Sequence, residues 1–295
     1  MKLAKYHGLG NDFVVVDLRA NPDGADAIAI QDPEVVRRVC DRQFGVGGDG
    51  VLAVLPPLSA ASDARMRVLN ADGSEAEMCG NGIRCVVVEL ATRGGIAKST
   101  LAIDTGAGRL VCELTGDGVT VAMGRARLER GEIGMTGPEH ERCVDQPIDV
   151  LGRTVRITAV SMGNPHAISF VDDASTDLRV LAETLGPTLE HHAWFPNRTN
   201  VEFVRARSKT ELDVVVWERG CGITLACGTG ACAVVAAAIV NGRADFDTDV
   251  RVNVLGGSLS IRVLPNMTDV LMHGPATHVF DGELEPRALA ARPRR

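Results

Sequence analysis

The sequence predicts an α+β protein of two similar domains, each a barrel-like, mostly antiparallel sheet around a central helix. Three observations predict this fold: a cysteine motif that occurs twice, strand-like runs in both halves, and a strongly apolar segment after each copy of the motif. The chain has 295 residues, which is comfortable for two domains of about 150 residues each. We therefore expect an internal duplication.

The duplication is clearest in the two segments MCGNGIRC and LACGTGAC. Their cysteines, Cys79 and Cys227, lie 148 residues apart in the chain. A second pair of segments, LGNDFVVVD and MGNPHAISFVD, matches Asn11 with Asn164. Matches in the same order at nearly the same spacing indicate a repeated domain.

Short runs rich in Val, Ile and Leu, bounded by Gly, Asp or Asn, predict strands in both halves. These runs are 14–18, 51–55, 66–69, 101–103, 119–123, 153–160, 167–171, 200–205, 211–217, 250–254 and 259–264. We assign residues 1–126 with 277–295 to an N-terminal domain, and residues 127–276 to a C-terminal domain. Residues 279–284 are expected to return to the first domain as an edge strand.

Four helices are predicted. Asp32-Pro33-Glu34 begins one of them, because it combines an N-cap, a proline at the first helical position and an early acidic residue. A second helix is expected to start near residue 175 or 177 and to end at Gly186-Pro187. The remaining two follow the repeated cysteines. Segment 231–240 is apolar all round, so a helix there must be enclosed by the sheet.

Composition argues against several classes of protein. With 31 Lys and Arg against 38 Asp and Glu, the net charge is −7, so we expect no nucleic-acid or membrane partner. The first residues resemble a strand rather than a signal peptide, and the longest apolar run is too short to span a bilayer. We expect a cytoplasmic protein that acts on a small molecule.

Most of the eight cysteines need no chemical role. In a reducing compartment they are expected to be thiols, and their spacing matches no metal site. A lone cysteine is usually a buried structural residue. We assign that role to Cys40, Cys85, Cys112, Cys143, Cys221 and Cys232. Cys79 and Cys227 differ, because packing alone does not explain an identical Gly-x-Gly setting in two places.

The repeated cysteines suit the inversion of an α-carbon. Each precedes a helix, whose unpaired N–H groups should lower the thiol pKa and accept a substrate carboxylate. A thiolate on one face of the carbon and a thiol on the other can remove and return a proton. A PLP enzyme needs a Schiff-base lysine, and none of the four lysines has a suitable setting. We expect an epimerase or racemase without cofactor or metal.

The motifs together resemble those of the diaminopimelate epimerases. The matching segments span nearly the whole chain: HGLGNDFVVVD, NADGSEAEMCGNGIRC, SMGNPHA, RTNVEF and ERGCGITLACGTGACA. Proline racemases are similar at a greater distance, with a histidine typically in place of Asn81. Read from the residues alone, His166 could be an ordinary polar residue, and Glu218-Arg219 could be a surface pair or face a cleft.

The resemblance implies interconversion of LL- and meso-diaminopimelate, which serves lysine and peptidoglycan precursor synthesis. It implies an acid/base pair of Cys79 and Cys227, supported by His166 and Glu218, in a cleft between the domains. It also implies a homodimer. The positions that match the family's substrate-binding residues are Asn11, Asn70, Gly80, Asn81, Asn164, Asn200, Glu218, Arg219, Gly228 and Thr229.

Two positions depart from the commoner family pattern. Gly50 stands where many members have Gln, and Ile223 stands where many have Glu. We expect both to affect substrate contacts rather than the reaction. The alternatives that remain are a proline or hydroxyproline racemase and, from another class, a thiol-rich metal or redox module. A single-thiol acyl transferase would leave the second cysteine motif unexplained.

Overall fold

The computed structural model describes residues 1–285 and divides the chain into two compact units. Unit 1 comprises residues 1–121 and the segment from Gly274 onward, and unit 2 comprises Ala122–His273. The last ten residues of the N-terminal domain assigned from sequence, 286–295, lie outside the described residues.

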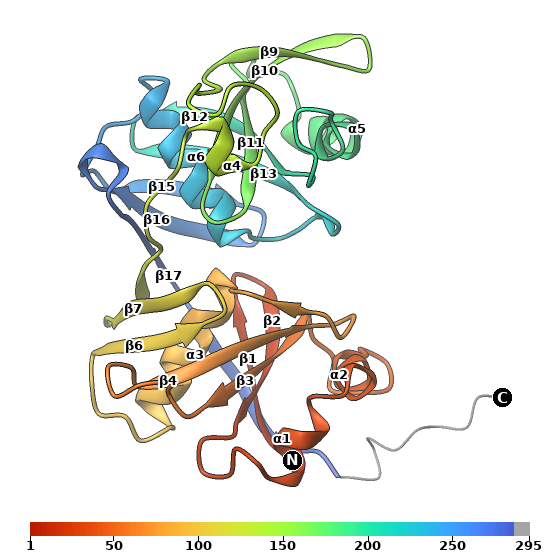
Figure 1. The fold of residues 1–295 in the computed structure, drawn as a ribbon, viewed down its shortest axis with the longest axis vertical. Helices are drawn as coiled ribbons and strands as arrows, with labels where there is room; N and C mark the ends of the chain where they lie inside the picture. The colour runs from red at the N-terminus through yellow and green to blue at the C-terminus, as the bar shows by residue number, and fades with distance from the viewer. Residues whose placement is uncertain (286–295) are drawn as a thin grey trace, which may run out of the picture. The chain divides into compact units, whose positions relative to one another are not determined.

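Unit 1 is a sheet that curves around the helix α3 (Figure 1). Its strands lie in the order β18-β1-β2-β3-β4-β6-β7-β8. The β2–β3 and β4–β6 pairs are parallel and the others are antiparallel. The elements of unit 1 are β1 (Lys2–Gly8), β2 (Asn11–Asp17), α1 (Ala25–Ala29), α2 (Pro33–Cys40), β3 (Gly50–Leu55), β4 (Ala64–Asn70), β5 (Glu75–Ala76), α3 (Gly80–Thr92), β6 (Thr100–Thr105), β7 (Gly108–Leu114), β8 (Val119–Ala122) and β18 (Thr277–Glu283).

Unit 2 repeats this topology around the helix α6 (Figure 1). Its strands lie in the order β9-β10-β11-β12-β13-β15-β16-β17, and the parallel pairs, β11–β12 and β13–β15, occupy the same places. The elements of unit 2 are α4 (Arg130–Ile133), β9 (Gln146–Val150), β10 (Arg153–Ser161), β11 (Pro165–Phe170), α5 (Leu178–Glu190), β12 (Asn200–Ser208), β13 (Glu211–Glu218), β14 (Gly222–Ile223), α6 (Gly228–Val240), β15 (Val250–Val254), β16 (Gly257–Val263), a 3-10 turn (Pro265–Met267) and β17 (Val270–Gly274).

Each sheet buries residues on both faces because side chains alternate along a strand. In β3, Val51 and Ala53 join a core cluster with α2, whereas Leu52 lies against the first turn of α3. In unit 2, α5 packs on one face of the sheet and α6 on the other. Residues 231–238 of α6 are all buried, as an apolar helix without a polar face requires.

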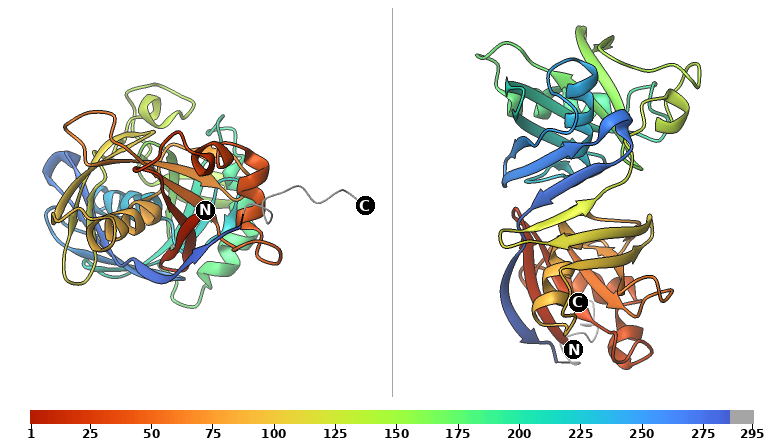
Figure 2. Two further views of the ribbon diagram at one scale, coloured as in Figure 1. Left: turned by 90° about the horizontal axis from the view of Figure 1, so that it is seen from below. Right: turned by 90° about the vertical axis from the view of Figure 1, so that its left-hand side faces the viewer.

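Two of the expected helix and strand boundaries are confirmed. Asp32 caps α2, and its side chain accepts a hydrogen bond from the Glu34 N–H (2.9 Å). The returning segment forms β18, which pairs antiparallel with β1. In the right-hand view of Figure 2 the blue strand β18 runs beside the red strand β1.

The expected end of the helix at Gly186-Pro187 is wrong. The helix α5 begins after its N-cap Asp177 and continues through Pro187 to Glu190. A Cβ at position 186 would lie 2.7 Å from Cγ of Trp217, so this glycine lets the helix approach β13 rather than ending it. Burial of Leu185 and Leu189 in the unit 2 core offsets the hydrogen bond that proline cannot make.

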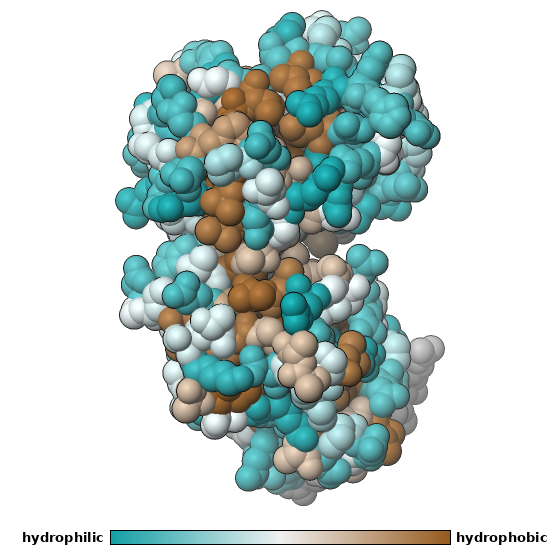
Figure 3. Space-filling model, turned by 60° about the vertical axis from the view of Figure 1, so that its left-hand side comes forward, coloured by the Kyte–Doolittle hydropathy of each residue, from teal (hydrophilic) through white to brown (hydrophobic). Residues whose placement is uncertain are grey.

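On the face that Figure 3 shows, hydrophilic residues predominate, and groups of hydrophobic residues lie among them. Among residues 1–285, no helix is long and apolar enough to cross a membrane.

Candidate functional site

The first repeated cysteine begins the central helix of unit 1. Cys79 is the N-cap of α3, and its Sγ accepts a hydrogen bond from the Gly82 N–H (3.4 Å). The thiol donates in turn to Oδ1 of Asn11 at 3.9 Å. The Asn81 amide also donates to this oxygen (3.1 Å). We refer to Cys79, Asn11 and Asn81 as the first half-site.

A charged loop orients the Asn11 amide. Its Nδ2 donates to Asp49 (2.7 Å), and Arg42 donates to the other oxygen of Asp49 (2.8 Å). Because the amide nitrogen is engaged there, Oδ1 is turned toward the Cys79 thiol. No motif in the sequence pointed to Asp49, although the Gly-rich segment GVGGDG contains it.

A buried arginine fixes the beginning of α3. Arg84 is 0% exposed, and its guanidinium donates to Oδ1 of Asn81 (3.0 Å) and to the carbonyl of Gly80 (3.0 Å). Its Nε donates to the Pro275 carbonyl (3.1 Å). Arg84 therefore holds Asn81 with its Nδ2 toward Asn11. The signal for it was an arginine next to the apolar run of residues 85–88 in this helix.

Asn70 occupies a different place in unit 1. It ends β4 opposite Gly50, and its amide donates to the Ser74 hydroxyl (3.0 Å). Its side chain is thus placed at the end of a central strand, whereas Asn11 contacts Cys79 and Asn81 donates to Asn11.

The second repeated cysteine begins the central helix of unit 2. Cys227 is the N-cap of α6 and is 6% exposed, and its Sγ lies 3.5 Å from the Thr229 hydroxyl. We refer to Cys227 with Asn164, His166, Thr229 and Glu218 as the second half-site.

The expectation of a lowered thiol pKa is wrong for Cys227. Burial raises its pKa well above the usual value, and the carboxylates of Glu218 and Glu202 raise it further. The hydroxyl of Thr229 and the Gly230 N–H favour the thiolate but are outweighed. The helix N-terminus alone therefore does not set the protonation of this cysteine.

A chain of hydrogen bonds runs from the sheet to the start of α6. The Nδ1 of buried His166 lies 2.6 Å from Oε1 of Glu202, and its Nε2 lies 3.0 Å from Oδ1 of Asn164. The Asn164 amide donates to the Thr229 hydroxyl (3.3 Å). Glu202 was not identified from the sequence, although it lies within the quoted segment RTNVEF.

Glu218 ends β13 beside Cys227. Burial raises the pKa of this carboxyl, and hydrogen bonds from Thr224 and from the Cys227 thiol oppose that rise. Thr224 donates its hydroxyl to Oε1 of Glu218. A carboxyl whose pKa is raised by burial next to a thiol can exchange a proton with it.

Asn200 and Arg219 form a separate group at one end of the β12–β13 pair, where β12 begins and β13 ends. The Arg219 backbone N–H donates to Oδ1 of Asn200 (2.8 Å), and the Asn200 amide donates to the Pro165 carbonyl (3.2 Å). The Arg219 guanidinium donates to the Asn197 carbonyl (3.0 Å).

The helix starts place backbone donors beside each thiol. Gly80 and Asn81 are the first two residues of α3, and Gly228 and Thr229 are the first two of α6. The first N–H groups of a helix have no partner within the helix, so they can bind a carboxylate.

The chain matches the family model for diaminopimelate epimerase over residues 3–129 and 158–279. The chain belongs to the diaminopimelate epimerase family. It is 46% identical over 288 residues to diaminopimelate epimerase 1 of Nostoc sp., covering 96% of this chain and 99% of the relative. It is 47% identical over 295 residues to the diaminopimelate epimerase of Desulfitobacterium hafniense, covering 98% of this chain and 100% of that relative.

Solved structures share the fold of this epimerase family member. A hydroxyproline epimerase from Agrobacterium vitis superposes with a TM-score of 0.69 at 18% identity, covering 98% of this chain and 93% of that one. At this identity the likeness shows the fold alone, which consists of two similar domains.

The two departures from the commoner family pattern have structural reasons. A Cβ at Gly50 would lie 2.7 Å from the Leu69 carbonyl oxygen, so a glutamine would require the backbone to shift. Ile223 packs against the hydrophobic core of unit 2, where a glutamate would lose apolar contacts.

The other cysteines are mostly buried, as expected, but Cys221 is exposed. It lies between two glycines with positive φ, Gly220 and Gly222, so a tight turn holds it at the surface. None of the eight cysteines, all within residues 1–285, is in a disulfide. The described residues contain no group of three His, Cys, Asp or Glu side chains placed to hold a metal ion.

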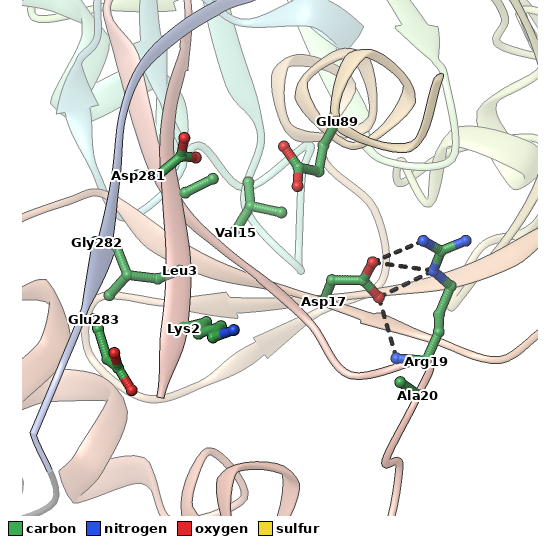
Figure 4. A pocket seen from close by; sticks show the side chains of 11 residues that line it. Lys2, Leu3, Val15, Asp17, Arg19, Ala20, Glu89, Asp281, Gly282 and Glu283 are labelled. Atoms are coloured by element: carbon green, nitrogen blue, oxygen red, sulfur yellow. Dashed lines mark hydrogen bonds and ion pairs between the residues drawn. The ribbon is translucent and has the colours of Figure 1, made fainter. Parts of the chain in front are cut away.

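A pocket of about 810 Å³ lies in unit 1, and its lining includes none of the residues assigned to the site. Charged side chains of both signs surround it (Figure 4), among them the ion pair of Asp17 and Arg19 (2.7 Å) and the carboxylate of Glu89. The Glu89 carboxylate also accepts a hydrogen bond from the Tyr6 hydroxyl (2.8 Å).

Proposed function

We propose that this protein is a PLP-independent epimerase that interconverts LL-2,6-diaminopimelate and meso-diaminopimelate. The observation that carries the proposal is the repeated N-cap cysteine, which each unit places at the start of its central helix, near an asparagine. Family membership supports the substrate. Lysine and peptidoglycan precursor synthesis would use this isomerisation.

The proposed reaction uses one thiol on each face of the α-carbon. Cys79 as thiolate removes the α-proton, and Cys227 as thiol donates its own proton to the opposite face. Cys79 is then the thiol and Cys227 the thiolate, which is the state that the reverse reaction needs. The raised pKa of Cys227 favours its role as the proton donor in the resting protein.

The neighbouring residues have separate roles in this proposal. The carboxylate at the reacting carbon would be held by the N–H groups of Gly80, Asn81, Gly228 and Thr229, which also stabilise the carbanion. His166 and Glu218 would support the Cys227 thiol. Arg219 suits the distant carboxylate of the substrate, because a guanidinium binds a carboxylate with two hydrogen bonds. Asn11, Asn70, Asn164 and Asn200 would bind polar groups of the substrate.

The proposal is tested by incubating the protein with LL-diaminopimelate in D2O and following the α-position by NMR. We expect meso-diaminopimelate to form with deuterium at the inverted carbon. Active protein that leaves the α-position without deuterium would refute proton transfer. Turnover of L-proline or hydroxyproline, but not diaminopimelate, would favour the racemase alternative. Stoichiometric zinc in the reduced protein without isomerisation would favour the metal module.

We also propose that the protein acts in the cytoplasm as a homodimer, on the strength of the family resemblance. Light scattering after size-exclusion chromatography should give twice the 31.2 kDa mass of the chain. A mass near that of one chain would contradict the dimer.

A further inference from the structure

Glu202 is a fully buried carboxylate within the second half-site. It is 0% exposed, and its Oε1 lies 2.6 Å from Nδ1 of His166. Its Oε2 has no hydrogen-bond partner among residues 1–285. An incompletely satisfied carboxylate in the interior costs stability, so its presence beside a reactive thiol indicates a functional role.

The first turn of α6 is shaped around this carboxylate. A Cβ at Gly230 would lie 2.8 Å from Oε1 of Glu202 and 3.3 Å from Sγ of Cys227. Only glycine at this position lets the carboxylate and the thiol lie on either side of the same helical turn.

We propose that Glu202 is a positioning residue, which orients His166 and, through it, the Asn164 amide beside Cys227. Both ring nitrogens of His166 face oxygens, namely Oε1 of Glu202 and Oδ1 of Asn164. When Glu202 is ionised, both oxygens can only accept, so the ring carries a proton on each nitrogen. Nε2–H then holds Oδ1 of Asn164, and the Asn164 amide nitrogen points to Thr229.

Without the negative charge of Glu202, the doubly protonated imidazole of His166 is no longer stabilised. In Glu202→Gln the side-chain carbonyl can still accept from Nδ1–H, which leaves Nε2 as an acceptor. The Asn164 amide must then turn over, and Nδ2 no longer points to Thr229. Glu202→Leu removes the acceptor as well. Leucine is the residue that unit 1 has at the corresponding strand position, Leu52.

The first readout is the protonation of His166, which requires no catalysis. Ring ¹⁵N spectra of histidine-labelled protein distinguish protonated from unprotonated nitrogens, and a His166→Asn variant identifies the resonances. We expect two protonated nitrogens in the unmodified protein and only one in Glu202→Gln and Glu202→Leu. Two protonated nitrogens in both variants would overturn the inference.

The control variant is Asp104→Asn, which changes a buried carboxylate of unit 1 that accepts from Leu58 N–H and Ser62. We expect it to lower stability without altering the His166 spectrum. A His166 spectrum that changes equally in Asp104→Asn would show that general loosening, rather than Glu202, is responsible.

The second readout rests on the proposed function and isolates each thiol. In a Cys79→Ala background no thiol can protonate the opposite face, so the carbanion waits until the Cys227 thiol has exchanged its proton with D2O and returns deuterium. Removing the outer partner of a metal-bound imidazole typically costs about 10- to 100-fold, and we expect a loss of similar size here with Glu202→Leu, which leaves His166 without its carboxylate. In a Cys227→Ala background the same substitution should leave the exchange by Cys79 nearly unchanged.

Equal losses in both backgrounds, or no loss in either, would contradict the inference. If neither parent variant exchanges the α-proton of diaminopimelate, the proposed function fails, while the His166 spectrum still decides whether Glu202 positions the imidazole.

Discussion

The first and second half-sites have the same backbone arrangement but differ in the charge of the side chains near the thiol. The parallel strand pairs have the same register, so that Phe13 corresponds to His166 and Leu52 corresponds to Glu202. A Cβ at Gly82 would meet Leu52 at 2.9 Å, as one at Gly230 would meet Glu202 at 2.8 Å. The parallel strand pair of unit 1 therefore has apolar residues at the two positions where that of unit 2 has an ionisable pair.

The strand ends differ in the same sense. Asn70 ends β4, and Glu218 ends β13 at the corresponding place. The thiol of Cys79 faces a neutral amide that is held by surface charges, whereas burial and two neighbouring carboxylates raise the pKa of Cys227. The two units thus share the cysteine and the glycine that follows it but surround the two thiols with different groups.

Removing either thiol should have the largest effect. We expect Cys79→Ala and Cys227→Ala each to lower the rate of inversion by about 1,000-fold or more, because each removes one proton-transfer group. Chiral separation of the isomers measures the rate. The matched controls are Cys112→Ala and Cys143→Ala, which remove buried thiols from each unit. Normal inversion in either Cys79→Ala or Cys227→Ala would show that the two cysteines do not act as a pair.

Oxidation should also stop the reaction, but reversibly. If both thiols serve one α-carbon, oxidation without substrate should join them in a disulfide and abolish activity. Dithiothreitol should restore it, and peptide mapping should find Cys79 linked to Cys227. A Cys221→Ala variant controls for the exposed thiol. Full activity after oxidation would argue that the two thiols do not share a site.

The effect of Glu218 on the pKa of the Cys227 thiol can be tested by alkylation. The Glu218 carboxylate raises the pKa of Cys227, although burial contributes more. In Glu218→Gln that pKa should fall, so alkylation of Cys227 by iodoacetamide should begin at lower pH. Mass spectrometry of the two cysteine peptides measures each rate, with Cys79 as the internal reference. If alkylation of Cys227 begins at the same or a higher pH in Glu218→Gln, the Glu218 carboxylate does not raise the pKa of this thiol.

Asp12 of β2 forms ion pairs with Lys5 of β1 and with Arg42, and these pairs should affect stability moderately. Burial alone would raise the pKa of Asp12, but hydrogen bonds from Arg42 and Lys5 lower it to about 2. A lowered folded pKa stabilises the protein above the unfolded value, and the contribution is lost as pH falls toward about 2.

We therefore expect Asp12→Asn to cost about 1–2 kcal/mol near pH 7, after allowing for solvent screening, and progressively less below about pH 4. Urea unfolding at several pH values measures the difference. Asp245→Asn, which removes an exposed pair with Lys209, should cost close to nothing. A cost that stays constant down to pH 2 would show that the charge of Asp12 is not responsible.

The sequence was sufficient for features that recur or that depend on local signals. The two N-cap cysteines, the enclosed helix 231–240 and the cap at Asp32 were all predictable, because motif, periodicity and capping are local. The end of α5 was not, since Gly186 serves contact with Trp217, a residue distant in the chain.

Long-range contacts also explain the residues that were missed. Asp49, Arg84 and Glu202 each bind a partner that is distant in the chain, at separations of 38, 191 and 36 residues, so no short motif reveals them. The pKa of Cys227 was misjudged because the helix N-terminus is visible in the sequence, whereas burial and the carboxylates of β12 and β13 are not.

The most direct test of two half-sites acting on opposite faces is the early distribution of deuterium in D2O. A thiol carries one proton, so the removing thiol can return only the substrate's own hydrogen, while the opposite thiol delivers deuterium. At low conversion, in each direction, we expect deuterium in the product and almost none in the recovered starting isomer. Deuterium at similar levels in both isomers would show that one group serves both faces and would contradict the account.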